Sequence, residues 1–107
     1  MFGGLLSAHV AWAASAAIVQ VTADGTSTVR PSWSPDGSRI AFQSSQKGAY
    51  RVFTVAADGS DRRVISQGDV DDRHPVWSPD STRLAVDSGT EIKREIWILD
   101  IATGQRT

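Results

Sequence analysis

The 107-residue sequence has no cysteine and only two histidines, His9 and His74. Without cysteine the chain can form neither a disulfide framework nor a thiolate metal site. A serine nucleophile needs a base and an orienting acid, and neither a Gly-x-Ser-x-Gly elbow nor a glycine-rich phosphate loop occurs. The sequence therefore predicts a protein with no catalytic residue, no cofactor and no metal ion.

An excess of charge of either sign is also missing. The chain has 11 basic and 12 acidic residues, which gives a net charge of −1. Nucleic acids and anionic membranes attract strongly basic surfaces, so neither is expected as the main partner. The proportions of charged residues (21%) and hydrophobic residues (40%) are those of an ordinary globular chain rather than a disordered one.

Residues 1–17 differ from the rest because they carry no Asp, Glu, Lys or Arg and are rich in alanine. Two small-x-small sites, at 11–13 and 14–16, resemble the cleavage site of a secretory signal peptide, although the start lacks a basic residue. Polar residues and glycine dilute the segment below what a membrane span needs. We predict export to the periplasm or outside the cell. The alternatives are a misassigned start or a helix on the sheet edge, with the protein then cytoplasmic.

One stretch of the sequence occurs twice. The heptapeptide PSWSPDG at 31–37 returns as PVWSPDS at 75–81, so that each tryptophan is 44 residues from its counterpart. In the same register RIAF at 39–42 matches RLAV at 83–86, and VFTV at 52–55 matches IWIL at 96–99. A period of about 40–45 residues is typical of a four-stranded propeller blade. We assign a structural role to Trp33, Pro35, Asp36, Gly37, Trp77, Pro79, Asp80 and Trp97.

The repeated motif predicts a hairpin turn. Pro35 presets its own φ, the side chain of Asp36 can bond nearby backbone, and Gly37 accepts a positive φ. Ser81 stands where the first copy has Gly37, and a left-handed serine costs about 1 kcal/mol. The second turn therefore either differs slightly or carries strain. On the flanking strands, the aromatic side chains are expected in the core between blades: Trp33, Phe42, Phe53, Trp77 and Trp97.

These patterns predict an all-β chain, a fragment of a β-propeller with about two four-stranded antiparallel blades after an apolar N-terminal segment. Strands are expected near 29–34, 39–44, 51–56, 62–66, 75–78, 83–88 and 95–100. The chain divides into the apolar segment 1–17, the last strand and turn of a preceding blade at 18–30, a first full repeat at 31–68 and a second at 69–107. In the second repeat the outer strand would begin at Arg106 and be cut off.

The densest polar cluster precedes the second copy of the motif. It contains Asp69, Asp71, Asp72, Arg73 and His74. Carboxylates and an imidazole can hold calcium or zinc, but this spacing fits no ligand pattern and Arg73 adds an opposing charge. We therefore predict a solvated loop between blades. If these residues have a function, they contact a protein partner at the mouth of a propeller channel.

The doubled motif, with the RIAF strand, the aromatic strand and ADGS at 57–60, resembles the WD-like β-propeller repeat of TolB type over residues 18–107. The resemblance implies a six-bladed propeller that binds proteins without catalysis, as in the periplasmic Tol–Pal envelope system. The same repeat forms the propeller of serine peptidases of the dipeptidyl and acylaminoacyl types, which is the alternative. A truncated, non-functional fragment is the third reading. Ser81 departs from the family's glycine.

Two repeats are fewer than a propeller ring needs. Each blade covers its faces with its neighbours, and stacked repeats need about three or more copies for stability. Two blades alone leave one apolar face of each uncovered, which marks an interface or an aggregation hazard, so the isolated chain is expected to be either marginally stable or oligomeric. The missing blades would come from further copies of the chain, with a trimer as the ordered option, or from a longer chain.

Overall fold

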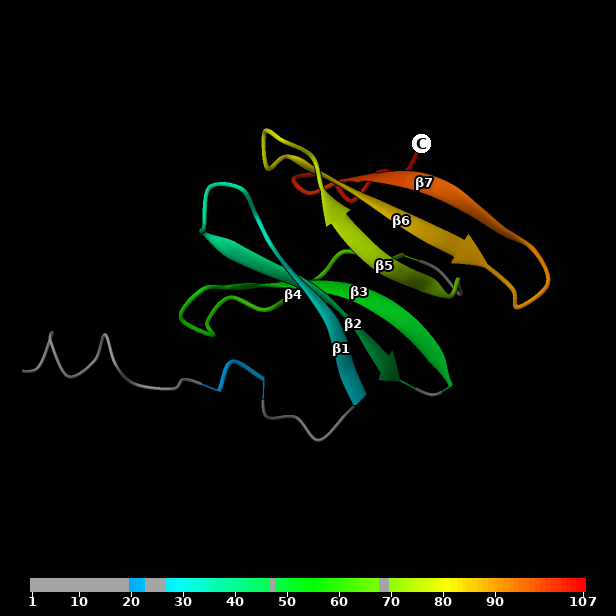
Figure 1. Ribbon diagram of the computed structural model, residues 1–107, viewed down its shortest axis with the longest axis horizontal. Coiled ribbons are helices and arrows are strands. Elements are labelled where there is room, and N and C mark those ends of the chain that lie inside the picture. The colour runs from blue at the N-terminus through cyan, green and yellow to red at the C-terminus, as the bar shows by residue number, and fades with distance from the viewer. Residues whose placement is uncertain (1–19, 23–26, 47, 68–69) are drawn as a thin grey trace, which may run out of the picture.

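The computed structural model describes residues 20–22, 27–46, 48–67 and 70–107. Within these ranges the secondary structure consists of β-strands, and no helix is present (Figure 1). The first sheet contains β1 (Ser27–Trp33), β2 (Arg39–Gln46), β3 (Ala49–Ala56) and β4 (Arg63–Val64). The second contains β5 (Asp72–Trp77), β6 (Arg83–Gly89) and β7 (Arg94–Asp100). Neighbouring strands are antiparallel and follow chain order. The all-β prediction is confirmed.

Two predictions concern the start of the chain. The apolar segment 1–17 lies outside the described residues. Of the strand expected at 18–22, only residues 20–22 are described, and they are not in a strand. Val21 nevertheless packs against apolar side chains of the first sheet, so this part of the chain contacts the blade that follows it.

The two sheets share one register, as the repeat predicts. In the first sheet Phe42 pairs with Phe53, and in the second Val86 pairs with Trp97. Each residue of the second pair lies 44 positions after its counterpart in the first pair. Beyond β7, Arg106 forms an isolated antiparallel bridge to Leu99, and the backbones of Ile98 and Thr107 exchange hydrogen bonds of 2.8 and 2.9 Å. This pairing is the counterpart of the β3–β4 ladder in the first sheet.

The main core lies between the two sheets, where β5 contacts β1, β2 and β3. Trp77 is at its centre and is only 9% exposed, and its indole Nε1 donates a 2.8 Å hydrogen bond to the carbonyl oxygen of Ser32. Ala41 and Val52 come from the first sheet, Ile65 directly follows β4, and Trp77, Leu84, Val86 and Leu99 come from the second sheet. Trp97 packs against this cluster while partly exposed. The predicted core role is confirmed for Trp77.

A smaller cluster lies on the opposite face of the first sheet. The rings of Phe42 and Phe53 stack with centroids 5.6 Å apart, and the guanidinium of Arg62 lies over both. Val55 completes the buried part. Trp33 is 59% exposed, so its predicted place in the core is wrong for the described chain. The physical reason is that the second sheet covers the other face of the first sheet.

Candidate functional site

The first Ser-Pro-Asp turn is held by one carboxylate oxygen. Oδ1 of Asp36 accepts hydrogen bonds from the hydroxyl of Ser34 (2.6 Å) and from the amide and hydroxyl of Ser38 (3.0 and 2.7 Å). The Ser34 hydroxyl also accepts a bond from the amide of Arg39, which ties the turn to the first residue of β2. Gly37 has a φ of 76°, as the sequence indicated.

The second turn repeats this arrangement. Oδ1 of Asp80 accepts bonds from the Ser78 hydroxyl (2.7 Å) and from the amide and hydroxyl of Thr82 (3.1 and 2.7 Å). Ser81 has a φ of 63°, so the left-handed serine considered from the sequence is present. Its hydroxyl accepts a 3.3 Å bond from the amide of Asp36, which joins the two turns across the blades. The motif is therefore a structural clamp at one end of each sheet.

We expect acid to weaken both turns together. The hydroxyl and amide donors lower the pKa of Asp36 and of Asp80 from 3.8 to about 2. A folded-state pKa below the unfolded value means that the contribution to stability is complete above about pH 4 and is lost as the pH falls toward 2. Thermal unfolding between pH 5 and pH 2, measured beside an Asp36→Asn/Asp80→Asn variant, checks this. The wild type should lose more stability than the variant, and equal losses would contradict the turn assignment.

The first strand of each sheet carries a β-bulge. Its register shifts between Val29 and Ser32 in β1 and between Arg73 and Val76 in β5. The residues before the two prolines, Arg30 and His74, are 44 apart and left-handed, with φ of 59° and 55°. Bulges re-aim side chains, and strained backbone concentrates at functional positions. The same distortion in both blades thus points to the surface that these strands share.

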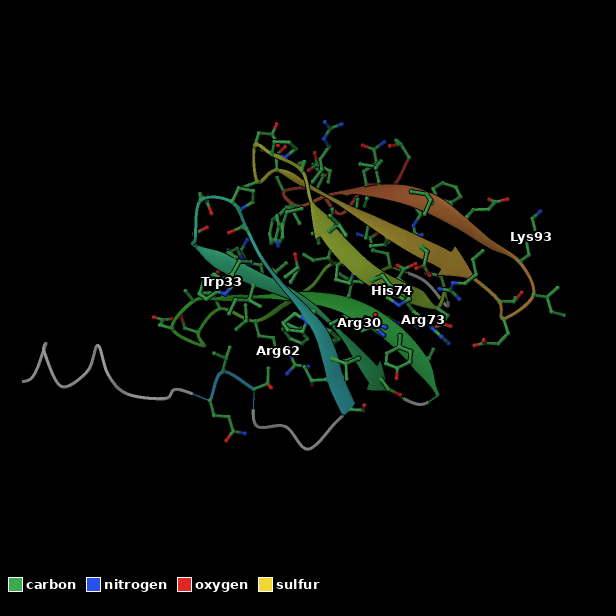
Figure 2. The ribbon with its side chains drawn as sticks, in the orientation of Figure 1. Arg30, Trp33, Arg62, Arg73, His74 and Lys93 are labelled. Carbon is green, nitrogen blue, oxygen red and sulfur yellow. The ribbon has the colours of Figure 1, made fainter. Side chains whose placement is uncertain are left out.

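That surface is a groove between β1 and β5. A hollow of about 310 Å³ lies there, lined by Arg30, Pro31, Ser32, His74, Pro75 and Val76. Figure 2 labels Arg30 and His74 where the two strands meet, and it shows Lys93 on a distant hairpin. The His74 amide donates a 2.7 Å bond to Oε1 of Gln43 in the first sheet, which fixes the bulge.

An ion-pair network adjoins the groove. Asp71 pairs with Arg73 at 2.7 Å, and Arg73 also reaches Glu91 at 2.8 Å and lies over the Tyr50 ring. Burial acts to raise the pKa of Asp71, but hydrogen bonds from the Arg73 side chain and the Tyr50 amide lower it overall. The Asp71 carboxylate is therefore engaged by Arg73, Arg94 and the Tyr50 amide, and it holds Arg73 in this ion-pair network.

His74 is positioned by a second carboxylate. Its Nδ1 bonds to Oδ2 of Asp87, whose other oxygen accepts from Nε of Arg94. Burial acts to raise the pKa of Asp87, and the bonds from His74 and Arg94 lower it overall. The His74 side chain is 47% exposed. No group of three or more acidic, histidine or cysteine side chains in the described parts of the chain could hold a metal ion.

Comparison with known proteins decides the family. Residues 3–107 match the family model described as the TolB beta propeller domain. The chain belongs to the TolB β-propeller family. A solved structure of an Agrobacterium tumefaciens protein assigned as TolB matches with a TM-score of 0.72 and 24% identity, over 81% of this chain and 34% of that one. TolB from Acinetobacter baumannii matches with 0.62 and 21%, over 81% and 22%. This chain therefore spans about a third or less of these relatives.

Within this TolB-family chain, the predicted polar loop needs correction. Asp72, Arg73 and His74 belong to β5, which begins three residues earlier than expected, and Asp69 lies outside the described residues. Asp72 is fully buried, and its Oδ2 lies 2.6 Å from Nη2 of Arg106. A buried carboxylate cannot contact a partner at the surface, so its role is structural. His74 lines the groove, and Asp71 and Arg73 form an ion pair with each other.

Arg30 is the residue of the TolB-family groove that the sequence interpretation missed. It is exposed, and no salt bridge or hydrogen bond of its side chain is found among the residues that the structure describes. The available signal was the alignment of Arg30-Pro31 with His74-Pro75 in the 44-residue register. Proline cannot donate to a strand ladder and therefore favours bulges, so both dipeptides indicated a break in the strand.

Proposed function

We propose that this chain is part of a non-catalytic propeller scaffold that binds proteins at the β1–β5 groove, in a cell-envelope assembly of the Tol–Pal kind. Membership of the TolB propeller family supports the scaffold. The observation that carries the binding role is the pair of left-handed bulges that place Arg30 and His74 over one groove. No helix in the described part of the chain is long and apolar enough to cross a membrane.

The chemistry of the groove favours an acidic segment of a partner protein. Arg30 offers guanidinium donors, and the Nε2 edge of His74 stays available while Nδ1 bonds to Asp87. Arginine forks match carboxylates in geometry and charge. Pro31 and Pro75 also line the groove, and neither residue has a backbone N–H group to donate. The ligand would therefore be selected by the side chains of the groove rather than by the backbone at these two positions.

Site-specific photo-crosslinking in the organism that encodes the chain tests this proposal. A photoreactive residue at position 30 or 74 should yield the same discrete protein adduct, recovered from the periplasmic fraction. Lys93 is a matched control because it is 79% exposed on a distant hairpin, and it should yield no such adduct (Figure 2). An Arg30→Glu change should abolish the adduct formed at position 74. Identical adducts from position 93, or none from position 74, would contradict the binding role, and an adduct found only in the cytoplasm would contradict export.

A further inference from the structure

We propose that His74 makes the β1–β5 groove sensitive to pH, because it offers a bound segment a hydrogen-bond acceptor at neutral pH and a charged donor in acid. At neutral pH the groove selects an acidic segment that places a hydroxyl or amide donor beside the carboxylate bound by Arg30. In acid it selects a second carboxylate at that place. The inference deepens the proposed function and rests on it, since it concerns which segment the groove accepts and at which pH.

The hydrogen bond of the His74 ring fixes the position of the ring proton. Nδ1 of His74 bonds to Oδ2 of Asp87. Burial acts to raise the pKa of Asp87, but the bonds from His74 and Arg94 lower it overall, so the carboxylate is ionised at neutral pH. An ionised carboxylate can only accept a hydrogen bond, and the proton therefore belongs to Nδ1. A neutral imidazole with its proton on Nδ1 has a lone pair on Nε2, which can only accept.

Asp87 is itself held in place by Arg94 of β7. Nε of Arg94 donates to Oδ1 of Asp87, the oxygen that His74 does not use. Nη2 of Arg94 donates to the Asp87 carbonyl at 2.9 Å and to the Asp71 carbonyl at 2.7 Å. Both carboxylate oxygens of Asp87 are thus engaged, one by the ring and one by the guanidinium. Asp87 and Arg94 are therefore positioning residues for His74.

The backbone keeps the ring at the groove. His74 is left-handed, with a φ of 55°, and its amide donates a 2.7 Å bond to the Gln43 side chain in the other sheet. The His74 side chain is 47% exposed and lines the hollow together with Arg30. No hydrogen bond of Nε2 is found among the residues that the structure describes. Nε2 is therefore the ring nitrogen that a ligand can reach.

The charges around His74 set the direction of the pH effect. The charged or titratable side chains nearest this end of the groove come from the elements that contact β5, from β7 and from β5 with the residue before it, and they are Arg30, Tyr50, Asp71, Arg73, Asp87 and Arg94. Asp71 pairs with Arg73, and Asp87 pairs with Arg94. The charge of Arg30 has no such partner among the described residues.

Protonation of His74 places a second positive charge in the hollow that Arg30 also lines. A segment with two carboxylates can then neutralise both charges. Protonation of His74 and binding of that segment favour each other, so its affinity rises as the pH falls. A segment with a hydroxyl donor beside one carboxylate loses the acceptor on Nε2 under the same conditions. Acid therefore changes which segment the groove prefers.

NMR titration of the isotope-labelled chain with short capped peptides tests the inference. The peptides carry Glu-Ser, Glu-Glu or Glu-Ala at their centre and are compared at about pH 7.5 and about pH 5.5, the range in which imidazole changes charge. The Glu-Glu peptide should bind about tenfold more tightly at the lower pH, because a charge-assisted hydrogen bond replaces an unfavourable contact between two acceptors. At the higher pH the Glu-Ser peptide should bind more tightly than the other two.

Variants separate the ring from its surroundings. His74→Gln cannot change charge in this range, so the gain for the Glu-Glu peptide at the lower pH should vanish. In the wild type the ring ¹⁵N signals at neutral pH should show the proton on Nδ1, and in Asp87→Asn they should show a mixture of tautomers. Lys93→Gln is the matched control because Lys93 is 79% exposed on a distant hairpin, and it should keep the pH dependence of the wild type (Figure 2).

The outcomes distinguish this inference from the proposed function. An equal pH dependence in the wild type and in His74→Gln, or a wild-type ring with its proton on Nε2, would overturn the inference alone. A crosslink at position 74 without binding of any peptide would also overturn it, because the groove would then not recognise carboxylates. Failure of both the crosslink and the peptides would overturn the proposed function and the inference together. The wild-type ring measurement needs no variant, so it decides the tautomer even where a substitution prevents folding.

Discussion

Trp77→Ala is expected to lower the free energy of unfolding by about 3–5 kcal/mol, the range for truncating a large aromatic side chain in a core. Trp77 is 9% exposed and packs with Ala41 and Val52 from the first sheet. The substitution removes these contacts and leaves the Ser32 carbonyl without the indole donor. Because small domains are stable by only about 5–15 kcal/mol, most of the cooperative folding should be lost. Urea unfolding followed by circular dichroism measures the change.

Trp33→Ala is the matched control for this prediction. It removes the same side chain from the same motif, at a position that is 59% exposed. The control should cost less than about 1 kcal/mol, as exposed substitutions usually do. Equal effects of the two substitutions would show that Trp77 is not packed between successive blades.

Arg106→Ala is expected to cost about 3 kcal/mol, the lower end of the range for breaking a buried ion pair. The Asp72 side chain is completely buried and has Nη2 of Arg106 at 2.6 Å, while Arg106 itself is 22% exposed. The substitution leaves a buried carboxylate without its cation and removes a guanidinium that lies 5.4 Å from the Trp97 ring centroid. The midpoint of urea unfolding at neutral pH measures the loss.

Arg63→Ala serves as the control for the ion pair. Arg63 and Asp61 are 2.7 Å apart, but about half of each side chain is exposed, and such pairs contribute about 0–1 kcal/mol. A double variant, Asp72→Asn with Arg106→Ala, should lose less than the sum of the two single changes, because no buried charge remains. Additive losses would show that Asp72 and Arg106 do not act as a pair.

The repeat made most of the fold predictable. The 44-residue spacing indicated the order of the strands, and the Ser-Pro-Asp motif indicated the turn. The structure confirms that both sheets are antiparallel and share one register. It also shows that a serine hydroxyl completes each turn, Ser34 in the first and Ser78 in the second. Each hydroxyl donates to the aspartate of its turn and accepts from the first amide of the strand that follows. Their presence in both copies was visible in the sequence, but their bonding depends on backbone geometry.

The candidate site was less predictable, because its residues depend on distant partners. The polarity of Asp72, Arg73 and His74 favoured a loop, yet Asp72 is buried in β5 through a partner 34 residues away. The sequence pattern likewise gave Trp33 and Trp77 the same role. Which of them is covered depends on which neighbouring blade is present, and a repeat cannot specify this by itself.

Hydrogen exchange of the tryptophan indole N–H groups, followed by NMR, tests the central claim most directly. The claim is that the two sheets pack as successive blades through Trp77, whose Nε1 donates to Ser32 across the interface. Tryptophan-to-phenylalanine changes assign the signals. The account predicts slow exchange at Trp77 and fast exchange at Trp33, which has the same sequence context but no covering blade in the described chain. Exchange at Trp77 as fast as at Trp33 would contradict the account.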